Sequence, residues 1–295
     1  MPKLKKSAPV AIRTGNFEFL KMNASGWEWG DAYHWLLTLT WPRFALFLFS
    51  AYLAVNILFA LLYTLGGACV AEIPPGSFSQ AFFFSVETLA TVGYGHMYPV
   101  SFYAHVITTI EIMLGMFGMA VTTGLIFVRF SRPTARIEFS HNLVISNFEG
   151  QPTLTMRVAN LRHQPMAEAE FRLMLARNEI TKEGEDIRRF YPLKLLNDRT
   201  ILFPVALTIR HIIDEASPLF GQSLEDLKRV DARFIASVVC IDTVIPAPVQ
   251  SQHDYCSRDL RFGHRFVEIY TEMEGGRFAV DYGQLHETEP APLSS

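Results

Sequence analysis

The sequence predicts a membrane-embedded α-helical part followed by an all-β domain. Two long stretches without charge lie before Pro133, and a short apolar segment and a glycine-containing pentapeptide stand between them. From Pro133 onward, short runs of β-branched and aromatic residues alternate with Gly, Asn, Asp and Pro, a sequence pattern typical of a β-sandwich. A chain of 295 residues is long enough for both parts.

Charge is distributed unevenly along the chain. Hydrophobic residues make up 49% of the sequence, and no Lys or Arg lies between Arg43 and Arg129. Residues 1–132 hold eight basic and six acidic residues, so the net charge of −3 leaves about −5 for the rest. This balance excludes a basic nucleic-acid binder. The three cysteines show no metal-ligand spacing and are expected to be free thiols: Cys69, Cys240 and Cys256.

The N-terminal region divides into two pieces. Residues 1–25 are polar and are expected to be a flexible, irregular N-terminus. Trp27–Thr40 has the apolar spacing of an amphipathic helix, and residues 26–41 contain all four tryptophans of the chain. Indole rings favour the membrane–water boundary, so we expect this helix to lie in the plane of the membrane surface.

Two helices are long enough to cross a bilayer, and together they define a pore domain over 42–132. No charged residue occurs in the 28 positions from Phe44 to Ala71, which predicts an outer helix at 42–65 with Pro42 in its first turn. The second helix is expected at 102–130. Basic residues flank the outer limits of the two spans and none lies between them, so both termini are expected in the cytoplasm.

The segment between the spans has the character of a re-entrant pore loop. Residues 78–90 are apolar and helix-length but too short to cross, and Thr91-Val92-Gly93-Tyr94-Gly95 (91–95) follows. Non-helical backbone, as expected for this pentapeptide, is tolerated at membrane depth only when it is buried in protein or lines a water-filled path. This pentapeptide is the known filter sequence of potassium channels.

The chemistry of the pentapeptide explains its residue types. Consecutive carbonyls can replace the water around K⁺ only if the backbone adopts conformations that side chains resist, and Gly93 and Gly95 adopt them cheaply. Thr91 adds a hydroxyl oxygen, and Val92 and Tyr94 can pack behind the ring. Four residues are expected to bind K⁺: Thr91, Val92, Gly93 and Tyr94. One chain supplies a quarter of the ring, which implies a homotetramer. No organic cofactor is expected.

Residues 133–289 are expected to form the β-sandwich. One short helix is expected within it, at Ser223–Val230, and residues 290–295 are expected to be a disordered tail. The predicted strands are Arg136–Ser146, Thr153–Asn160, Ala167–Glu179, Arg188–Leu196, Ile201–Ile209, Arg233–Ile241, His264–Thr271 and Arg277–Tyr282.

Three stretches resemble the bacterial inwardly rectifying potassium channels, the prokaryotic Kir family. They are FFFSVETLATVGYG (Phe82–Gly95), RFSRPTAR (Arg129–Arg136) and SPLFG (Ser217–Gly221), and the resemblance extends from Trp27 to about Glu289. It implies a cytoplasmic immunoglobulin-like β-sandwich, a homotetramer in the bacterial inner membrane, and a gate where the inner helices converge. Regulation by anionic lipids such as phosphoinositides is implied as well.

The resemblance assigns roles to residues of the pore domain. By its position, Phe127 resembles the residue that forms the family's hydrophobic constriction at the gate. The alternative is a phenylalanine that faces lipid. Gly115 resembles the hinge of the inner helix, with Gly118 nearby, and close helix packing is the alternative. Glu87 and Thr88 are expected to support the filter, because a carboxylate at that depth is costly.

The sequence departs from the family pattern at several positions. Eukaryotic members place an Arg after the filter that can pair with this Glu, whereas His96 and Met97 stand here. Met119 and Thr123 are expected to line the cavity. At the position of Met119, strong rectifiers carry an acid, and cytoplasmic Mg²⁺ or polyamines block the pore there. Strong rectification is therefore not expected. Glu111 is an acid about two turns higher that we expect near Glu87.

Four arginines lie where a cytoplasmic headgroup layer would be: Arg43, Arg129, Arg132 and Arg136. Each basic residue near an anionic surface contributes roughly 1 kcal/mol to binding. Anionic headgroups such as phosphoinositides are the expected ligands, and ordinary positive-inside anchoring is the alternative.

Two other protein classes compete with a potassium channel. A different two-span cation channel with a Rossmann-like sensor would need GxGxxG after a strand, and that motif is missing. A non-conducting, membrane-anchored β-domain receptor would not explain TVGYG. No catalytic motif indicates an enzyme, and His141, His211 and His264 are expected to be structural rather than metal ligands.

Overall fold

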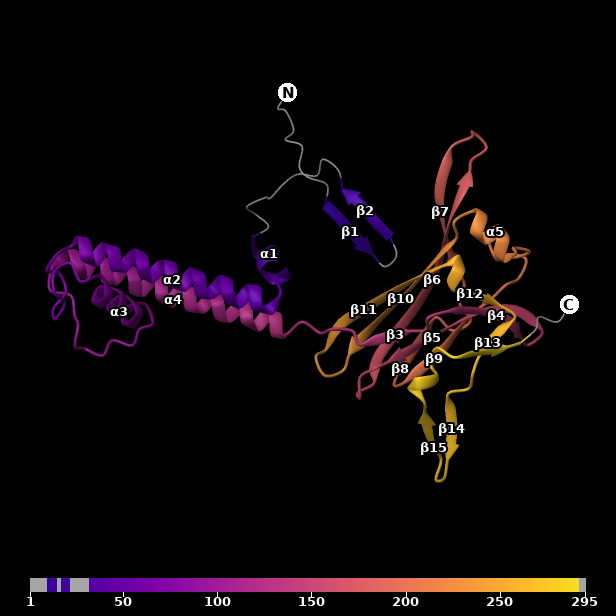
Figure 1. Ribbon diagram of the computed structural model, residues 1–295. Coiled ribbons are helices and arrows are strands. Elements are labelled where there is room, and N and C mark those ends of the chain that lie inside the picture. The colour runs from indigo at the N-terminus through magenta and orange to yellow at the C-terminus, as the bar shows by residue number, and fades with distance from the viewer. Residues whose placement is uncertain (1–9, 15–16, 22–31, 292–295) are drawn as a thin grey trace. The chain divides into compact units, whose positions relative to one another are not determined.

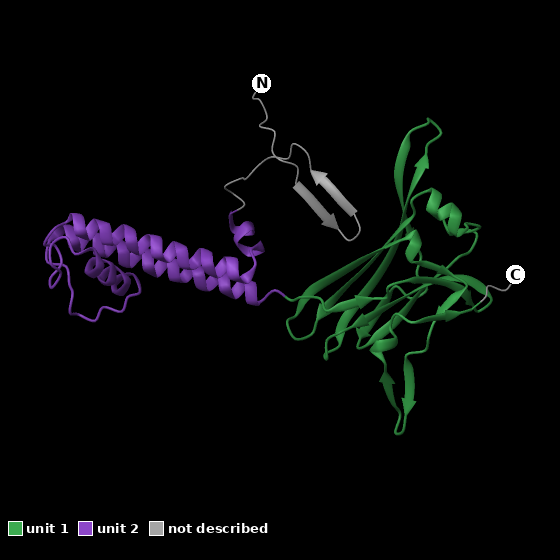
Figure 2. Ribbon diagram, viewed as in Figure 1, with its two compact units in different colours: residues 1–24, 133–295 green, residues 25–132 purple. Residues whose placement is uncertain are grey.

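The computed structural model describes residues 10–14, 17–21 and 32–291 and divides the chain into two compact units. The membrane unit comprises residues 25–132, and the β unit comprises residues 1–24 and 133–295 (Figure 2). Each unit is considered by itself.

The membrane unit is helical. Its two long helices run side by side, and a short helix packs against both of them near one end of the pair (Figure 1). Its helices are α1 (Ala32–Thr38), α2 (Trp41–Leu65), α3 (Phe78–Leu89) and α4 (Phe102–Phe130). At about 1.5 Å per residue, α2 and α4 exceed the roughly 30 Å of a hydrocarbon core. By length and composition, both are candidates to cross a membrane.

Local sequence explains where these helices begin and end. Pro42 lies in the first turn of α2, where a missing N–H costs no hydrogen bond. α2 ends before Gly66, and Gly67 has a φ of +68°. Ser101 caps α4, because its hydroxyl accepts a hydrogen bond from the Ala104 N–H at 3.1 Å.

The expected interfacial helix is shorter at its C-terminal end than the sequence suggested. α1 ends at Thr38, and Trp41 begins α2 rather than ending the preceding helix. Trp27 and Trp29 lie outside the described residues. The prediction that the helix continues to Thr40 is wrong, because Thr40 is the extended N-cap of α2.

The β unit has two five-stranded sheets and additional hairpins. Its strands are β1 (Val10–Thr14), β2 (Phe17–Lys21), β3 (Ile137–Phe139), β4 (Leu143–Phe148), β5 (Gln151–Asn160), β6 (Met166–Ile180), β7 (Asp186–Leu193), β8 (Arg199–Phe203), β9 (Ala206–Ile212), β10 (Arg233–Asp242), β11 (Ala247–Cys256), β12 (Leu260–Phe262), β13 (His264–Phe266), β14 (Tyr270–Met273), β15 (Arg277–Val280) and β16 (Thr288–Pro290). The short helix is α5 (Leu224–Arg229), within the expected range.

The two sheets are built mainly from antiparallel pairs. One has the order β11-β10-β6-β7 with β8 on β6, and the other has the order β12-β4-β5-β3 with β9 on β5. Side chains of both sheets meet in one core, in which Phe171 of β6, Met156 of β5 and Phe234 of β10 are at most 2% exposed. The expected all-β sandwich is therefore confirmed.

Several predicted strand boundaries are wrong for identifiable reasons. The strand expected at Ile201–Ile209 is two strands, β8 and β9, because Pro204 lacks an N–H and interrupts the ladder. The strand expected at Arg136–Ser146 is interrupted by a turn in which the Ser140 hydroxyl donates to the Asn142 carbonyl. The sequence does not predict β11, because its central residues QSQHD are polar and give no local sign of its pairing with β10.

Two terminal regions expected to be irregular contain strands. β1 and β2 form an antiparallel hairpin within residues 1–25, and β16, which pairs with β13, ends at Pro290, the first residue of the expected tail. Residues 292–295 lie outside the described part. Tertiary pairing of short segments leaves little mark on local composition, which explains both errors.

Candidate functional site

The segment Thr91–Gly95 has an alternating backbone. Positive φ angles occur at every second residue, +56° at Thr91, +55° at Gly93 and +82° at Gly95, and not at Val92 or Tyr94. Alternation between left- and right-handed conformations brings successive carbonyls toward the same side of the chain. The glycines adopt this shape as expected. A positive φ at Thr91 is unusual for a β-branched residue and indicates local strain, which sequence reasoning missed.

The C-terminal end of α3 holds the start of this segment. The Thr91 N–H donates to the Thr88 carbonyl at 3.0 Å, and the Val92 N–H donates to the Glu87 carbonyl at 2.8 Å. Thr88 is buried. The pentapeptide is thus joined to a helix end, where the helix dipole concentrates partial negative charge.

A single chain leaves the pentapeptide open to its surroundings. Val92 is 51% exposed and Tyr94 is 78% exposed. These are apolar and aromatic side chains, and half or more of each stays exposed within one chain.

Glu87 lines a pocket of about 290 Å³ beside the filter segment, together with Thr91, Gly93 and Met97. Its side chain is half-buried, and its carboxylate makes no hydrogen bond to another residue in the part of the chain described here. The position expected to hold a pairing Arg is Met97, which cannot supply one.

A buried polar network connects the three main helices behind the pentapeptide. Glu111 of α4 is fully buried and accepts hydrogen bonds from the Tyr63 hydroxyl of α2 at 2.6 Å and from the Ser85 hydroxyl of α3. The Tyr63 hydroxyl also lies 3.0 Å from the Thr108 hydroxyl, and the Ser85 oxygen lies 3.1 Å from Asn56 Oδ1. Polar groups within apolar spans were the signal that could have identified the network.

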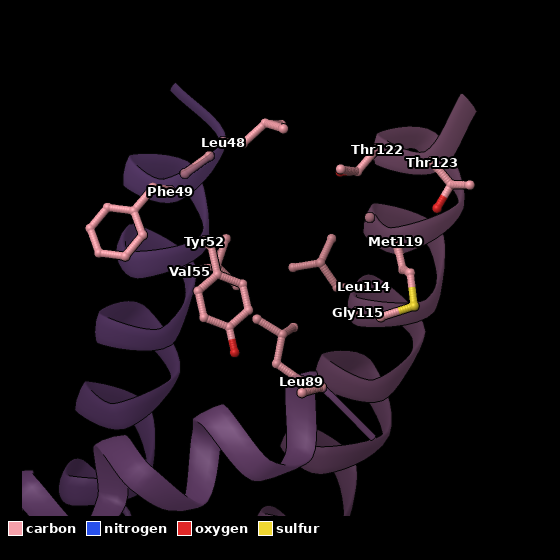
Figure 3. Close-up of a pocket in the computed structure, with 13 residues that line it drawn as sticks. Leu48, Phe49, Tyr52, Val55, Leu89, Leu114, Gly115, Met119, Thr122 and Thr123 are labelled. Atoms are coloured by element: carbon pink, nitrogen blue, oxygen red, sulfur yellow. The ribbon is translucent and has the colours of Figure 1, made fainter. Parts of the chain in front are cut away.

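An apolar cavity of about 510 Å³ lies between α2, the end of α3 and α4 (Figure 3). Figure 3 shows Phe49 and Tyr52 on the α2 side and Met119 and Thr123 on the α4 side. The pocket brings together four residues that the sequence singled out: Gly115, Gly118, Met119 and Thr123.

The two glycines of α4 differ in their surroundings. A Cβ on Gly115 would come within 2.2 Å of the Leu89 carbonyl oxygen, so α4 can approach the end of α3 only because this residue has no side chain. A Cβ on Gly118 would meet nothing within 4 Å. The packing alternative considered for Gly115 thus has direct structural support. Phe127, nearer the C-terminal end of α4, is 70% exposed in one chain.

The arginines at the helix ends have different partners. Arg129 donates from its two terminal nitrogens to the carbonyls of Leu36 and Leu39, at 2.8 and 2.7 Å. Its guanidinium also lies 4.7 Å from the Trp41 ring centroid. Arg129 therefore binds the last turn of α1 and the residue after it, which occupies one N–H of each terminal nitrogen.

The other three arginines are exposed: Arg43, Arg132 and Arg136. Arg132 makes one long contact, 3.4 Å from its Nη1 to the Leu37 carbonyl. Arg43 and Arg132 belong to the membrane unit, whereas Arg136 belongs to the β unit.

Comparison with known proteins agrees with this architecture. Residues 48–132 match the family model described as ion channel. This match and the two helices that are long and apolar enough to cross a membrane define the membrane unit as that of an ion channel.

The β unit narrows the class further. Residues 137–295 match the family model described as inward rectifier potassium channel C-terminal domain. The chain is 41% identical over 274 residues to the inward rectifier potassium channel Kirbac3.1 of Paramagnetospirillum magnetotacticum, covering 93% of this chain and 92% of that one. It is 29% identical to the mouse ATP-sensitive inward rectifier potassium channel 12, covering 94% of this chain and 70% of the relative. The chain belongs to the inward rectifier potassium channel family.

Proposed function

We propose that this protein conducts K⁺ passively through a filter formed by Thr91–Gly95. The observation that carries the proposal is the positive φ at Thr91, Gly93 and Gly95, every second residue of the segment. A backbone that alternates in this way can turn successive carbonyls to one side. Carbonyl rings of this kind replace the hydration shell of K⁺ in potassium channels. Membership of the inward rectifier family supports the same reading.

In the proposed site, the carbonyl oxygens of Thr91, Val92, Gly93 and Tyr94 bind K⁺ ions. The end of α3 contributes partial negative charge toward an entering cation. Glu87 and Thr88 support the filter from behind, Thr88 through its carbonyl and its burial. No bond is made or broken in this process, so the protein acts as a channel and not as an enzyme.

A homotetramer supplies what one chain lacks. In the most apolar 18-residue stretches of α2 and α4, only 17% and 11% of the residues are buried within the chain. The filter residues Val92 and Tyr94 are exposed as well. Lipid would cover part of this surface and neighbouring copies would cover the rest. Four copies close a ring of carbonyls, which one copy cannot form.

We infer that the C-terminal half of α4 lines the pathway below the filter. Phe127 is the proposed gate residue, because four phenylalanines at a narrow point can close a pore sterically or by dewetting. Met119 and Thr123 are the proposed cavity-lining residues. A Cβ on Gly118 would meet nothing within 4 Å, and the missing Cβ of Gly115 lets α4 pack against the end of α3; both remain proposed hinge positions.

Anionic lipids are the proposed regulators. Arg43, Arg132 and Arg136 are exposed and available for a headgroup, each worth roughly 1 kcal/mol near an anionic surface. Arg129, the fourth proposed lipid contact, acts mainly through its bonds to Leu36 and Leu39.

The proposed setting is the bacterial plasma membrane, crossed twice, with both termini in the cytoplasm. Met119 carries no charge where strong rectifiers carry an acid. Block by cytoplasmic Mg²⁺ or polyamines is therefore proposed to be weak at this position. The absence of Lys and Arg between Arg43 and Arg129 supports the topology.

Flux through purified protein tests the function. Proteoliposomes loaded with K⁺ should take up ⁸⁶Rb⁺, excess external K⁺ should compete, and excess Na⁺ should not. Added phosphoinositide should change the rate, and Phe127→Ala should raise it by widening the constriction. A non-conducting receptor would give no uptake above empty liposomes, and a non-selective cation channel would lose uptake to Na⁺.

A further inference from the structure

We propose that Glu138, His141 and His286 form a site for a divalent transition-metal ion, with Zn²⁺ as its probe, in the β unit. One ligand atom from each residue can be chosen so that all three lie within 4.8 Å of one another. The site is separate from the K⁺ filter, because all three residues belong to the β unit.

The spacing of two ligands already suits zinc. His286 Nε2 lies 3.4 Å from Glu138 Oε1. Zinc bonds of about 2.1 Å at tetrahedral angles place neighbouring ligand atoms roughly 3.4 Å apart. An ion can therefore bridge this pair without moving β3, which carries Glu138.

The third ligand needs only a side-chain movement. The imidazole rings of His141 and His286 are stacked, with centroids 3.6 Å apart and planes 6° apart. Parallel rings do not aim their nitrogens at one point between them, so one ring must rotate to bind a shared ion. His141 is exposed and free to do so, whereas His286 is more enclosed.

The metal-free cluster leaves polar atoms unsatisfied. Nδ1 of His286 is buried without a hydrogen-bond partner among the described residues. The 3.4 Å separation from Glu138 is long for a hydrogen bond to its other nitrogen. Because Nε2 is the nitrogen that faces Glu138, an ion bound there would replace this long contact with a metal bond, whereas Nδ1 would stay without a partner among the described residues.

The donor set selects the kind of ion. Two imidazoles and one carboxylate suit Zn²⁺ and its neighbours among the transition metals, whereas Ca²⁺ and Mg²⁺ prefer oxygen ligands. Because His141 is exposed, a fourth position stays open to water. The site is therefore reversible and accessible rather than a closed structural centre.

A bound ion would join distant parts of the β unit. Glu138 lies in β3, at the beginning of the unit, and His286 lies just before β16, near its end. Because the unfolded chain cannot hold these ligands together, binding stabilises the folded state. The sequence placed His141 among structural histidines, since nothing in the spacing reveals a partner so far along the chain.

Zinc titration of the full-length protein tests the proposal. The protein is purified in detergent without a polyhistidine tag and titrated with Zn²⁺ by calorimetry and thermal unfolding. We expect one Zn²⁺ per chain, and a melting temperature of the β unit that rises by roughly 5–10 °C at a hundred times Kd. Mg²⁺ at the same concentration should give no shift.

Matched variants locate the site. His286→Gln and His141→Gln should each weaken Zn²⁺ binding by at least about tenfold, while His163→Gln, which changes an exposed histidine outside the cluster, should not. Co²⁺ bound to the wild type should show the intense visible absorption of four-coordinate geometry. That absorption should be lost in His141→Gln.

Unchanged Zn²⁺ affinity and stoichiometry in both His141→Gln and His286→Gln would overturn the proposal. So would an equal loss in His163→Gln. If His286→Gln fails to fold, His141→Gln still decides the question, because its side chain is exposed. ⁸⁶Rb⁺ uptake by the metal-free protein keeps this result separate from the proposed conduction.

Discussion

The membrane unit and the β unit bury their apolar side chains in different ways. All eight residues from Thr153 to Asn160 of β5 are buried within one chain, because the second sheet covers one face and a smaller cluster around Ile269 covers part of the other. In α4, by contrast, only Ala104, Glu111 and Leu125 are buried. The β unit therefore completes its own core, whereas the membrane unit leaves most of its apolar side chains uncovered within one chain.

Because of this difference, we expect changes in the β unit to affect mainly stability and changes in the filter to affect mainly function. Disturbing the core of the β unit should cost folding free energy in a single chain. Disturbing the filter should abolish function while leaving the fold of one chain intact. Four predictions test this division, and they are ordered by the size of the expected effect.

The largest effect is expected from Gly93→Ala. A φ of +55° costs an L-residue roughly 1–2 kcal/mol, and the strain would be repeated in every copy around a ring. ⁸⁶Rb⁺ uptake should fall to the level of empty liposomes, with no change in the melting temperature of the β unit. Gly221→Ala is a matched control, because Gly221 has a similar φ of +67° in the β unit. It should lose some stability and keep its flux; K⁺ selectivity retained in Gly93→Ala would contradict the filter assignment.

The next effect is expected from Phe234→Ala in the β unit. Phe234 is fully buried between the sheets, and truncating a buried Phe typically costs about 3–5 kcal/mol of unfolding free energy. Urea unfolding of the β unit, followed by circular dichroism, measures the loss. Phe278→Ala removes a ring that is 65% exposed and should cost less than about 0.5 kcal/mol. Equal losses would mean that the core is not closed within one chain.

A smaller effect is expected from Glu111→Ala in the membrane unit. This change removes the buried acceptor that the Ser85 and Tyr63 hydroxyls share. It leaves them only Asn56 Oδ1 and the Thr108 hydroxyl, at a cost of about 1–3 kcal/mol. Thermal unfolding in detergent should show a lower midpoint for the membrane unit and an unchanged midpoint for the β unit. Glu111→Gln keeps an acceptor oxygen and should recover part of the loss. An unaltered midpoint in both variants would show that the network contributes no stability.

The smallest effect is a dependence of β-unit stability on pH. Burial lowers the pKa of His211 below its ordinary value of 6.5. The neutral ring has two partners, the Lys194 carbonyl at 2.7 Å and the Ser217 hydroxyl at 2.8 Å. The unfolded chain takes up a proton near pH 6.5 while the folded chain resists it. Stability should therefore be constant above about pH 7 and fall as the pH drops below 6.5, by at most about 1.4 kcal/mol per pH unit for one group.

Urea midpoints measured between pH 5 and pH 8 check this dependence. His211→Gln should reduce the slope below pH 6.5. It should not remove it, because burial lowers the pKa of His253 as well. A wild-type midpoint that rises on acidification would contradict the sign.

Much of the membrane unit could be predicted from the sequence. Apolar runs without charge locate α2 and α4, since a helix is the structure that satisfies its backbone within a single apolar segment. The glycines of Thr91–Gly95 predict a special backbone. The partners of Glu111 were not predicted, because they are distant in sequence. The positive φ of Thr91 was not predicted, because a β-branched residue rarely adopts it.

Less of the β unit could be predicted. Long strands such as β6 and β10 show their pattern locally, but β11 and β16 owe their structure to partners elsewhere in the chain. The cluster of Glu138, His141 and His286 is the extreme case. None of the three is informative alone, and only the folded sheet brings them together.

The sequence by itself determined the two-span membrane segment, the filter loop and the all-β character of the remainder, because hydrophobic length, glycine freedom and strand periodicity act over a few neighbouring residues. Only the tertiary structure decided where Arg129 and Glu111 find their partners, how tightly Gly115 packs on Leu89, and which histidines meet. Those outcomes depend on contacts between residues far apart in the chain, and such contacts leave no periodic signal in the sequence.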